Sequence, residues 1–225
     1  LIALAALSVL GSSLSPSRFA ALVAKEGVHH PLRLALLLTL PLMAFAGIIP
    51  LTHHFHFEPG FGVTREPLAS SVLAMDVARA AGLSLLVYGA SFLVAMASYI
   101  SLGGAFGSEE GAKGLALRAW LYAGWLVPLT GPLGLAMSVV FWVVPASAGS
   151  VGAALAFLAF LLPFLIFLVD LQRVAREALG CSLGGSIVVT SVPILLFLLT
   201  QAILIGDPPG TGVLAPWLPP GMAPG

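Results

Sequence analysis

Five long apolar runs restrict the fold of this chain more than any other feature of its sequence. Each run holds about 20 mostly apolar residues, the length with which an α-helix crosses a hydrocarbon layer about 30 Å thick. The runs are bounded by charged residues, glycine or proline, and lie near residues 31–52, 80–102, 119–145, 151–171 and 182–206. We therefore predict an all-α fold, a polytopic membrane helix bundle with five transmembrane helices over residues 31–206.

The composition agrees with a membrane protein. Of the 225 residues, 59% are hydrophobic and 8% are charged, whereas a soluble domain carries about 25% charged residues. Too few polar side chains exist to cover a soluble surface, so lipid must solvate part of the chain. The net charge is zero, and we expect no nucleic-acid partner. The single cysteine, Cys181, excludes an internal disulfide and a cysteine-based zinc cluster. Asparagine is absent, which is typical of a thermophile or a GC-rich genome.

The third run leaves two topologies open, because VPLTGPLG at 127–134 could kink one long helix or form a re-entrant pair. Basic residues concentrate on the cytoplasmic side of membrane proteins. If the third run does not cross, the two sides carry five and four basic residues. If it crosses, Arg65 and Arg79 lie on one side and seven lie on the other, namely Arg18, Lys25, Arg33, Lys113, Arg118, Arg173 and Arg176. We therefore predict five spans in the cell (inner) membrane, with a cytoplasmic N-terminus and an external C-terminus.

Aromatic residues flank the third run. Trp120, Tyr122 and Trp125 lie near one end of it, and Trp142 lies near the other. Such residues are enriched where a helix passes through the two headgroup regions of a bilayer. We expect these side chains to form two aromatic belts.

Residues 1–30 are predicted to form an N-terminal interfacial segment on the cytoplasmic side. Within it, SPSRFAALVAKEG at 15–27 has helix start and stop signals and an apolar face. We expect an amphipathic helix on the cytoplasmic leaflet, with Arg18 and Lys25 in contact with lipid headgroups. A helix with an ordinary solvent-facing side is the alternative. At the other end of the chain, residues 207–225 are predicted to form an external tail rich in proline and glycine.

Three stretches together resemble bacterial members of the Yip (Ypt-interacting protein) domain family. They are SPSRFAALVAKEG before the first span, SLGGAFGSEEGAKGLALRAWLYAGWLVPL, and LVDLQRVAREALGCSLGGSIVVTSVPILLF. The resemblance implies five spans, a cytoplasmic N-terminus, and a non-enzymatic protein that self-associates or organises membrane and partner proteins. Eukaryotic members associate with Rab-type GTPases through an acidic cytosolic region that has no counterpart in this sequence, so we do not expect GTPase recruitment here.

The sequence favours neither an enzyme nor an ion-coupled pump. It holds no HExxH, P-loop or CxxC pattern. The glycine-rich segment GGAFGSEEG at 103–111 is expected to be a flexible connector, and its alternative is a phosphate contact through glycine amides. No Asp, Glu, Lys or Arg lies near the middle of a predicted span, where a coupled carrier would need one. An uncoupled pore or a lipid-handling cavity stays open, with Thr130, Ser138, Thr190 and Gln201 as its candidate lining.

The segment DLQRVAREALG at 170–180 follows the fourth span on the predicted cytoplasmic side. Helical spacing predicts ion pairs of Arg173 with Asp170 and with Glu177, and we expect Asp170 to reach the interface. A self-paired interfacial helix is one interpretation of this segment. The other is that Arg173 and Arg176 hold an anionic lipid headgroup.

Three of the five histidines lie in LTHHFHFEPG at 51–60. His53, His54 and His56, with Glu58, are candidate ligands for zinc or copper, and Glu66 or Asp76 could complete the site. His29 and His30 cannot contribute, because they lie on the other side of the predicted membrane. If the segment is helical, His53 and His56 are one turn apart, whereas in an extended segment His54 and His56 share a face. An interfacial cap with alternating Phe residues and a pH switch are the alternatives to a metal site.

The sequence thus predicts a non-enzymatic membrane-organising or partner-binding protein without a cofactor. Its expected partners are membrane lipids, further copies of itself and other membrane proteins. The alternative is a transporter, channel or lipid-handling protein with an external histidine-rich metal-binding loop. A polar cavity reaching the middle of the membrane would favour transport, and a closed bundle with an apolar outer surface would favour the leading hypothesis.

Overall fold

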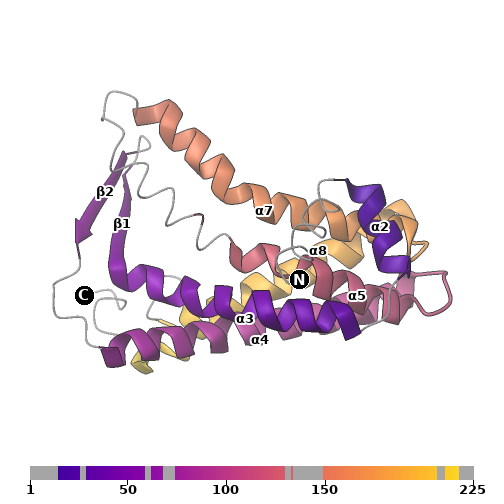
Figure 1. Ribbon diagram of the computed structural model, residues 1–225, viewed down its shortest axis with the longest axis horizontal. Coiled ribbons are helices and arrows are strands. Elements are labelled where there is room, and N and C mark those ends of the chain that lie inside the picture. Colours follow the sequence, from indigo (N-terminus) through magenta and orange to yellow (C-terminus); the bar gives the residue numbers. More distant parts are fainter. Residues whose placement is uncertain are drawn as a thin grey trace.

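The computed structural model describes residues 15–25, 29–58, 62–67, 74–129, 133, 149–206 and 211–217. Within these ranges the chain is mostly helical (Figure 1). The elements are α2 (Pro16–Lys25), α3 (His29–Thr52), β1 (His53–Glu58), β2 (Gly62–Pro67), α4 (Ala74–Phe106), α5 (Ala112–Ala123), α7 (Gly149–Glu177), α8 (Leu183–Ile205) and the short 3₁₀ helix η2 (Ala215–Trp217). The all-α prediction is confirmed at this level, and the antiparallel β1–β2 hairpin is an addition to it.

Four of the predicted spans coincide with long helices. The runs near 31–52 and 80–102 lie inside α3 and α4, and the run near 151–171 lies inside α7. The run near 182–206 matches α8, which begins at an N-cap and ends at a glycine. The Ser182 hydroxyl accepts a hydrogen bond from the Gly185 N–H at 3.1 Å, and Gly206 adopts φ 91°. The start and stop signals in the sequence therefore set the limits of this helix.

The third predicted span is not one continuous helix where the structure describes it. Helix α5 begins at Ala112 and ends at Ala123, and a turn at Gly124 and Trp125 separates it from one further helical turn at 126–129. A Cβ atom at position 124 would lie 2.4 Å from the ring of Phe92 on α4. Glycine lets that ring pack directly against the backbone at the break. Most of the remainder of this run lies outside the described residues.

The helix ends fall into two groups (Figure 1). The α2 end, as we call it, comprises α2, the start of α3, the end of α4, the start of α5, the end of α7 and the start of α8. The hairpin end comprises β1, β2, the starts of α4 and α7, and the end of α8. The seven basic residues that the sequence analysis assigned to one side all lie on elements at the α2 end. Arg79 and Arg65 lie on α4 and β2 at the hairpin end.

The described part of the C-terminal tail folds back onto the hairpin end. The N–H groups of Val213 and Leu214 donate to the carbonyl oxygens of Ile203 and Leu204 at 3.0 Å and 2.9 Å. The Arg79 guanidinium lies 3.4 Å from the carbonyl oxygen of Pro216. These bonds connect the tail to α8 and to the start of α4.

The bundle exposes apolar side chains along its flanks. Exposed Leu, Ile or Val residues occur on α3, α4, α7 and α8, while Thr39, Ser84, Ser91, Asp170, Ser186 and Thr190 are buried. Within the described residues, Val77–Phe106 and Leu183–Ile205 are long and apolar enough to cross a membrane. Only 33% and 22% of their most apolar windows are buried, whereas a core helix of a soluble protein would be mostly buried. Lipid is the solvent that suits such a surface.

Candidate functional site

The interior of the bundle is closed by aromatic side chains around Trp120. Its ring centroid lies 5.5 Å from those of Phe92 and Tyr99 on α4, and 5.3 Å from that of Phe167 on α7. The predicted aromatic belt at this end of the third run is therefore wrong, because Trp120, Tyr122 and Trp125 are all buried. Trp142 lies outside the described residues. These rings pack against neighbouring helices because α5 lies inside the bundle, in contact with α3, α4 and α7.

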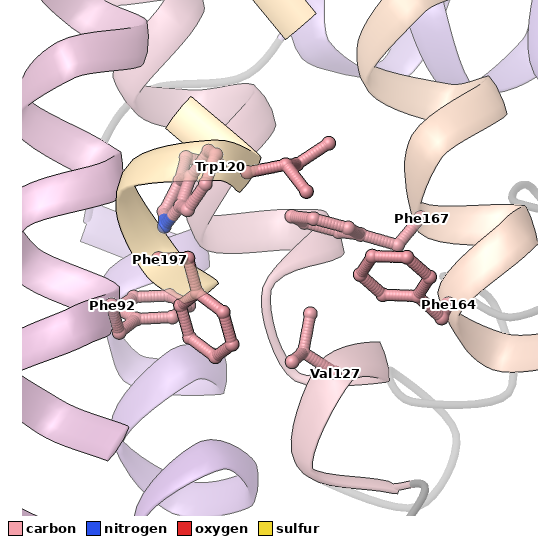
Figure 2. A pocket seen from close by; sticks show the side chains of 7 residues that line it. Phe92, Trp120, Val127, Phe164, Phe167 and Phe197 are labelled. Atoms are coloured by element: carbon pink, nitrogen blue, oxygen red, sulfur yellow. The ribbon is translucent and has the colours of Figure 1, made fainter. Parts of the chain in front are cut away.

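One enclosed cavity of about 10 Å³ lies beside Trp120 (Figure 2). Side chains from α4, α5, α7 and α8 converge on it. Its lining is apolar and consists of Phe92, Trp120, Val127, Phe164, Phe167, Ile194 and Phe197. A volume this small holds at most about one water molecule, and an apolar lining gives that water no partners. The cavity is therefore a packing defect in the aromatic core and is too small for a substrate.

The residues predicted to line a polar cavity are not brought together around this space. Thr130 and Ser138 lie outside the described residues. Thr190 is buried on α8, where its hydroxyl donates to the carbonyl oxygen of Ser186 at 2.9 Å. Gln201 lies three helical turns further along α8 with its side-chain amide nitrogen buried. A polar cavity lined by these residues stays a prediction.

Helix α2 turns its apolar face toward the protein. Phe19 and Val23 are fully buried, and α2 contacts α7 and α5. The predicted helix is present, but the face that was expected to enter lipid is occupied by these neighbours. Arg18 and Lys25 remain exposed on the opposite side of α2, where headgroups or water can reach them.

The end of α7 carries the most open polar groove that the described residues form. This groove, which we call the basic groove, has a volume of about 270 Å³ and is lined by Val169, Gln172, Arg173 and Arg176. Both arginines are exposed. The sequence predicted Arg173 and Arg176 as headgroup contacts but missed Val169 and Gln172, which lie on the same helix face. Arg18 and Lys25 do not line the groove.

Two charged neighbours of the basic groove behave differently. Arg173 forms the predicted ion pair with Glu177, with Nη1 and Oε1 3.0 Å apart and both side chains partly exposed. The expectation that Asp170 reaches the interface is wrong, because Asp170 is fully buried. Helical rotation explains the difference, since Asp170 lies on the side of α7 that packs into the bundle and Arg173 does not.

The glycine-rich segment 103–111 is held in place by the turn between α7 and α8. The N–H and hydroxyl of Ser108 donate to the carbonyl oxygens of Leu179 and Gly180 at 3.0 Å and 3.1 Å. The Gly107 N–H donates to the Gly103 carbonyl oxygen at 2.9 Å. These amides are already used inside the protein, so they are not available to a phosphate. The segment is an ordered strut between α4 and α5 in place of the flexible connector expected from its composition.

The same turn contains a pattern that the expectation of a non-enzyme overlooked. Residues 180–184 read Gly-Cys-Ser-Leu-Gly and match the GxSxG spacing of hydrolase nucleophiles. Such a nucleophile lies between a strand and a helix, whereas Ser182 lies between helices α7 and α8. Its hydroxyl also accepts the Gly185 N–H as the N-cap of α8. The spacing here therefore serves to begin a helix.

The histidine segment forms strand β1 of the hairpin. Its register pairs His54 with Glu66, His56 with Thr64 and Glu58 with Gly62. Of the two conformations that the sequence allowed, the structure has the extended one, in which positions 54 and 56 share a face. His53 lies on the other face of β1. No group of three or more metal-binding residues occurs among the side chains that the structure describes, and these do not include the hairpin. A zinc or copper site at this hairpin stays a prediction.

Scans against protein-family models, curated proteins and solved structures each returned no match to this chain. The resemblance to the Yip domain family therefore rests on the sequence stretches quoted above. The described geometry offers a closed aromatic interior, a basic groove at the α2 end and a two-stranded hairpin at the opposite end.

Proposed function

We propose that this chain is a non-enzymatic integral protein of the cell (inner) membrane, of the Yip-domain type, that self-associates and organises membrane or partner proteins. It crosses the membrane five times, with the α2 end in the cytoplasm and the C-terminus outside. The single observation that carries this proposal is the combination of a closed aromatic interior with apolar outer flanks.

The helix lengths support more crossings than α4 and α8 alone. Helices α3 and α7 have 24 and 29 residues, which corresponds to about 36 Å and 44 Å. A hydrocarbon core is about 30 Å thick. Exposed leucines occur along the described parts of both helices. Each therefore has the length and the outer surface of a span.

The order of helix ends supports a third crossing between α5 and α7. Helix α5 begins at the α2 end, and α7 begins at the hairpin end, where it contacts β2 (Figure 1). A chain that starts at one end and resumes at the other has to traverse the membrane in between. The separation of seven basic residues from two supports the same orientation.

Two glycines on α4 support self-association. At Gly82 and Gly89 a Cβ atom would meet no other atom within 4 Å. The two positions are seven residues apart and lie on adjoining parts of one helix surface. Small residues at such positions let a second helix approach closely in a membrane. A second copy of the chain is the proposed occupant.

Self-association is tested by single-molecule photobleaching of labelled protein in nanodiscs or vesicles. We expect multiple bleaching steps for the native chain and mostly single steps for Gly89→Leu, because the added side chain blocks close approach. Gly114→Leu is the matched control, since Gly114 is also open but lies near the start of α5. A native chain that is monomeric at high protein density, or a Gly89→Leu variant that associates normally, would contradict the proposed role.

A further inference from the structure

We propose that the outer face of α7 binds one anionic phospholipid of the cytoplasmic leaflet, with its phosphate in the basic groove. The proposal rests on the membrane orientation given above. The ligand chemistry is a phosphate on a glycerol backbone with acyl chains, and a lipid is the source to which we assign it.

The basic groove continues directly into an apolar track. Leu158, Leu162, Leu165 and Val169 are each about half exposed, and they are spaced four, three and four residues apart. At 100° per residue, these four side chains together with Gln172, Arg173 and Arg176 fall within about 100° of arc on α7. One helix face therefore presents an apolar track followed by two guanidinium groups.

The dimensions of the track suit one leaflet. From Leu158 to Val169 the helix rises about 16 Å, which is half of a hydrocarbon core about 30 Å thick. Arg173 lies one turn beyond Val169, at the depth where the phosphate of a lipid alongside the track would lie. A soluble phosphate would use the groove but would leave the track unused.

The charges around the groove favour an anion. Arg173 shares its guanidinium with Glu177 in an ion pair whose members are 47% and 40% exposed. Exposed pairs of this kind are weak and rearrange easily. No ion pair of Arg176 is found among the described residues. Two arginines against one carboxylate leave an excess of positive charge, and guanidinium groups bind phosphate in a two-point geometry.

The spacing of the track also suits a second α7 helix, which is the rival occupant. A parallel pair of α7 helices joined by this face would bring two copies of Arg173 and Arg176 together. Like charges at such a contact oppose association. An anionic lipid neutralises those charges, and the observations therefore favour lipid.

The test uses the full chain in detergent and measures lipid retention by native mass spectrometry. The probes are dioleoyl phosphatidylglycerol, dioleoyl phosphatidylcholine and water-soluble glycerol 3-phosphate. We expect the native chain to retain the anionic lipid about tenfold better than the zwitterionic one. R173Q/R176Q should lose this preference, and E177Q should strengthen it. The charge-matched control R33Q/K113Q, on exposed residues at the same end but outside the groove, should keep it.

Three results would overturn the proposal. The first is equal retention of the two lipids by the native chain. The second is a preference that survives R173Q/R176Q in a variant with native elution and melting. The third is glycerol 3-phosphate binding as strongly as the lipid, which would indicate a soluble anion site. Cross-linking of Leu162→Cys between chains at the expense of lipid would instead identify a second copy as the occupant. Failure of membrane insertion is a separate readout, because a carbonate wash of membranes measures it without added lipid.

Discussion

The hydroxyl of Tyr99 on α4 donates to the backbone carbonyl oxygen of Leu171 on α7 across 2.9 Å. Both residues are fully buried. The bond joins helices 72 residues apart in sequence at the point where α7 approaches the basic groove. It is thus one of the connections that fix the orientation of the groove relative to the rest of the bundle.

Removing this hydroxyl should destabilise the bundle. We expect Tyr99→Phe to lower the free energy of unfolding by about 0.6–2 kcal/mol, the range for interhelical hydrogen bonds in membranes and buried sites. Tyr88→Phe on the same helix is the matched control, and we expect a smaller change. Titration of the purified chain with SDS measures both. Equal stability of Tyr99→Phe and the native chain would show that the bond contributes nothing.

Gly124→Ala should be destabilising by about 1–3 kcal/mol, because its Cβ atom would lie 2.4 Å from the Phe92 ring. A smaller partner at position 92 should relieve this clash, so Gly124→Ala and Phe92→Leu together should cost less than the sum of the two single changes. Gly114→Ala, where a Cβ atom meets nothing within 4 Å, should be neutral or stabilising. Melting temperatures of the variants measure these effects, and simple additivity would contradict the contact.

Cys181 should react slowly with N-ethylmaleimide in the native protein. It is 6% exposed, and burial raises the pKa of its thiol. The thiolate is the reactive form, so alkylation should be slow near neutral pH and should accelerate only above the usual thiol range. Glu110→Cys in a Cys181→Ala background is the exposed control. Labelling of native Cys181 as fast as in SDS-denatured protein would show that the thiol is accessible.

The histidine hairpin is predicted to be an interfacial cap, so the purified native chain should hold no stoichiometric zinc or copper at neutral pH. Elemental analysis followed by zinc titration measures this directly. One bound ion per chain that disappears in His54→Ala/His56→Ala would support the metal-binding alternative. Loss of that ion in Glu66→Gln would add the residue that the register places opposite His54.

Much of the helical architecture could be predicted because long apolar runs have few alternatives to a helix. The break at Gly124 could not, since its cause is the ring of Phe92, 32 residues away in the sequence. The burial of Trp120 and Asp170 also depends on which neighbours their helix faces meet. Periodicity identifies a face but does not identify the neighbour.

The basic groove was half predictable. Its two arginines stand out in an almost uncharged chain. Its apolar part becomes visible only when residues 158–176 are placed on one helix face and their exposure is known. The hairpin was left open by the sequence, because HHFHFE alternates like a strand but directly follows a helical run.

The most direct test of the five-span orientation is the accessibility of single cysteines in intact cells. In a Cys181→Ala background, Glu110→Cys marks the α2 end and Val213→Cys marks the hairpin end, and both positions are exposed. We predict that a membrane-impermeant maleimide labels Val213→Cys in intact cells and labels Glu110→Cys only after permeabilisation. Labelling of both positions from the same side of the membrane would contradict an odd number of crossings and the orientation proposed here.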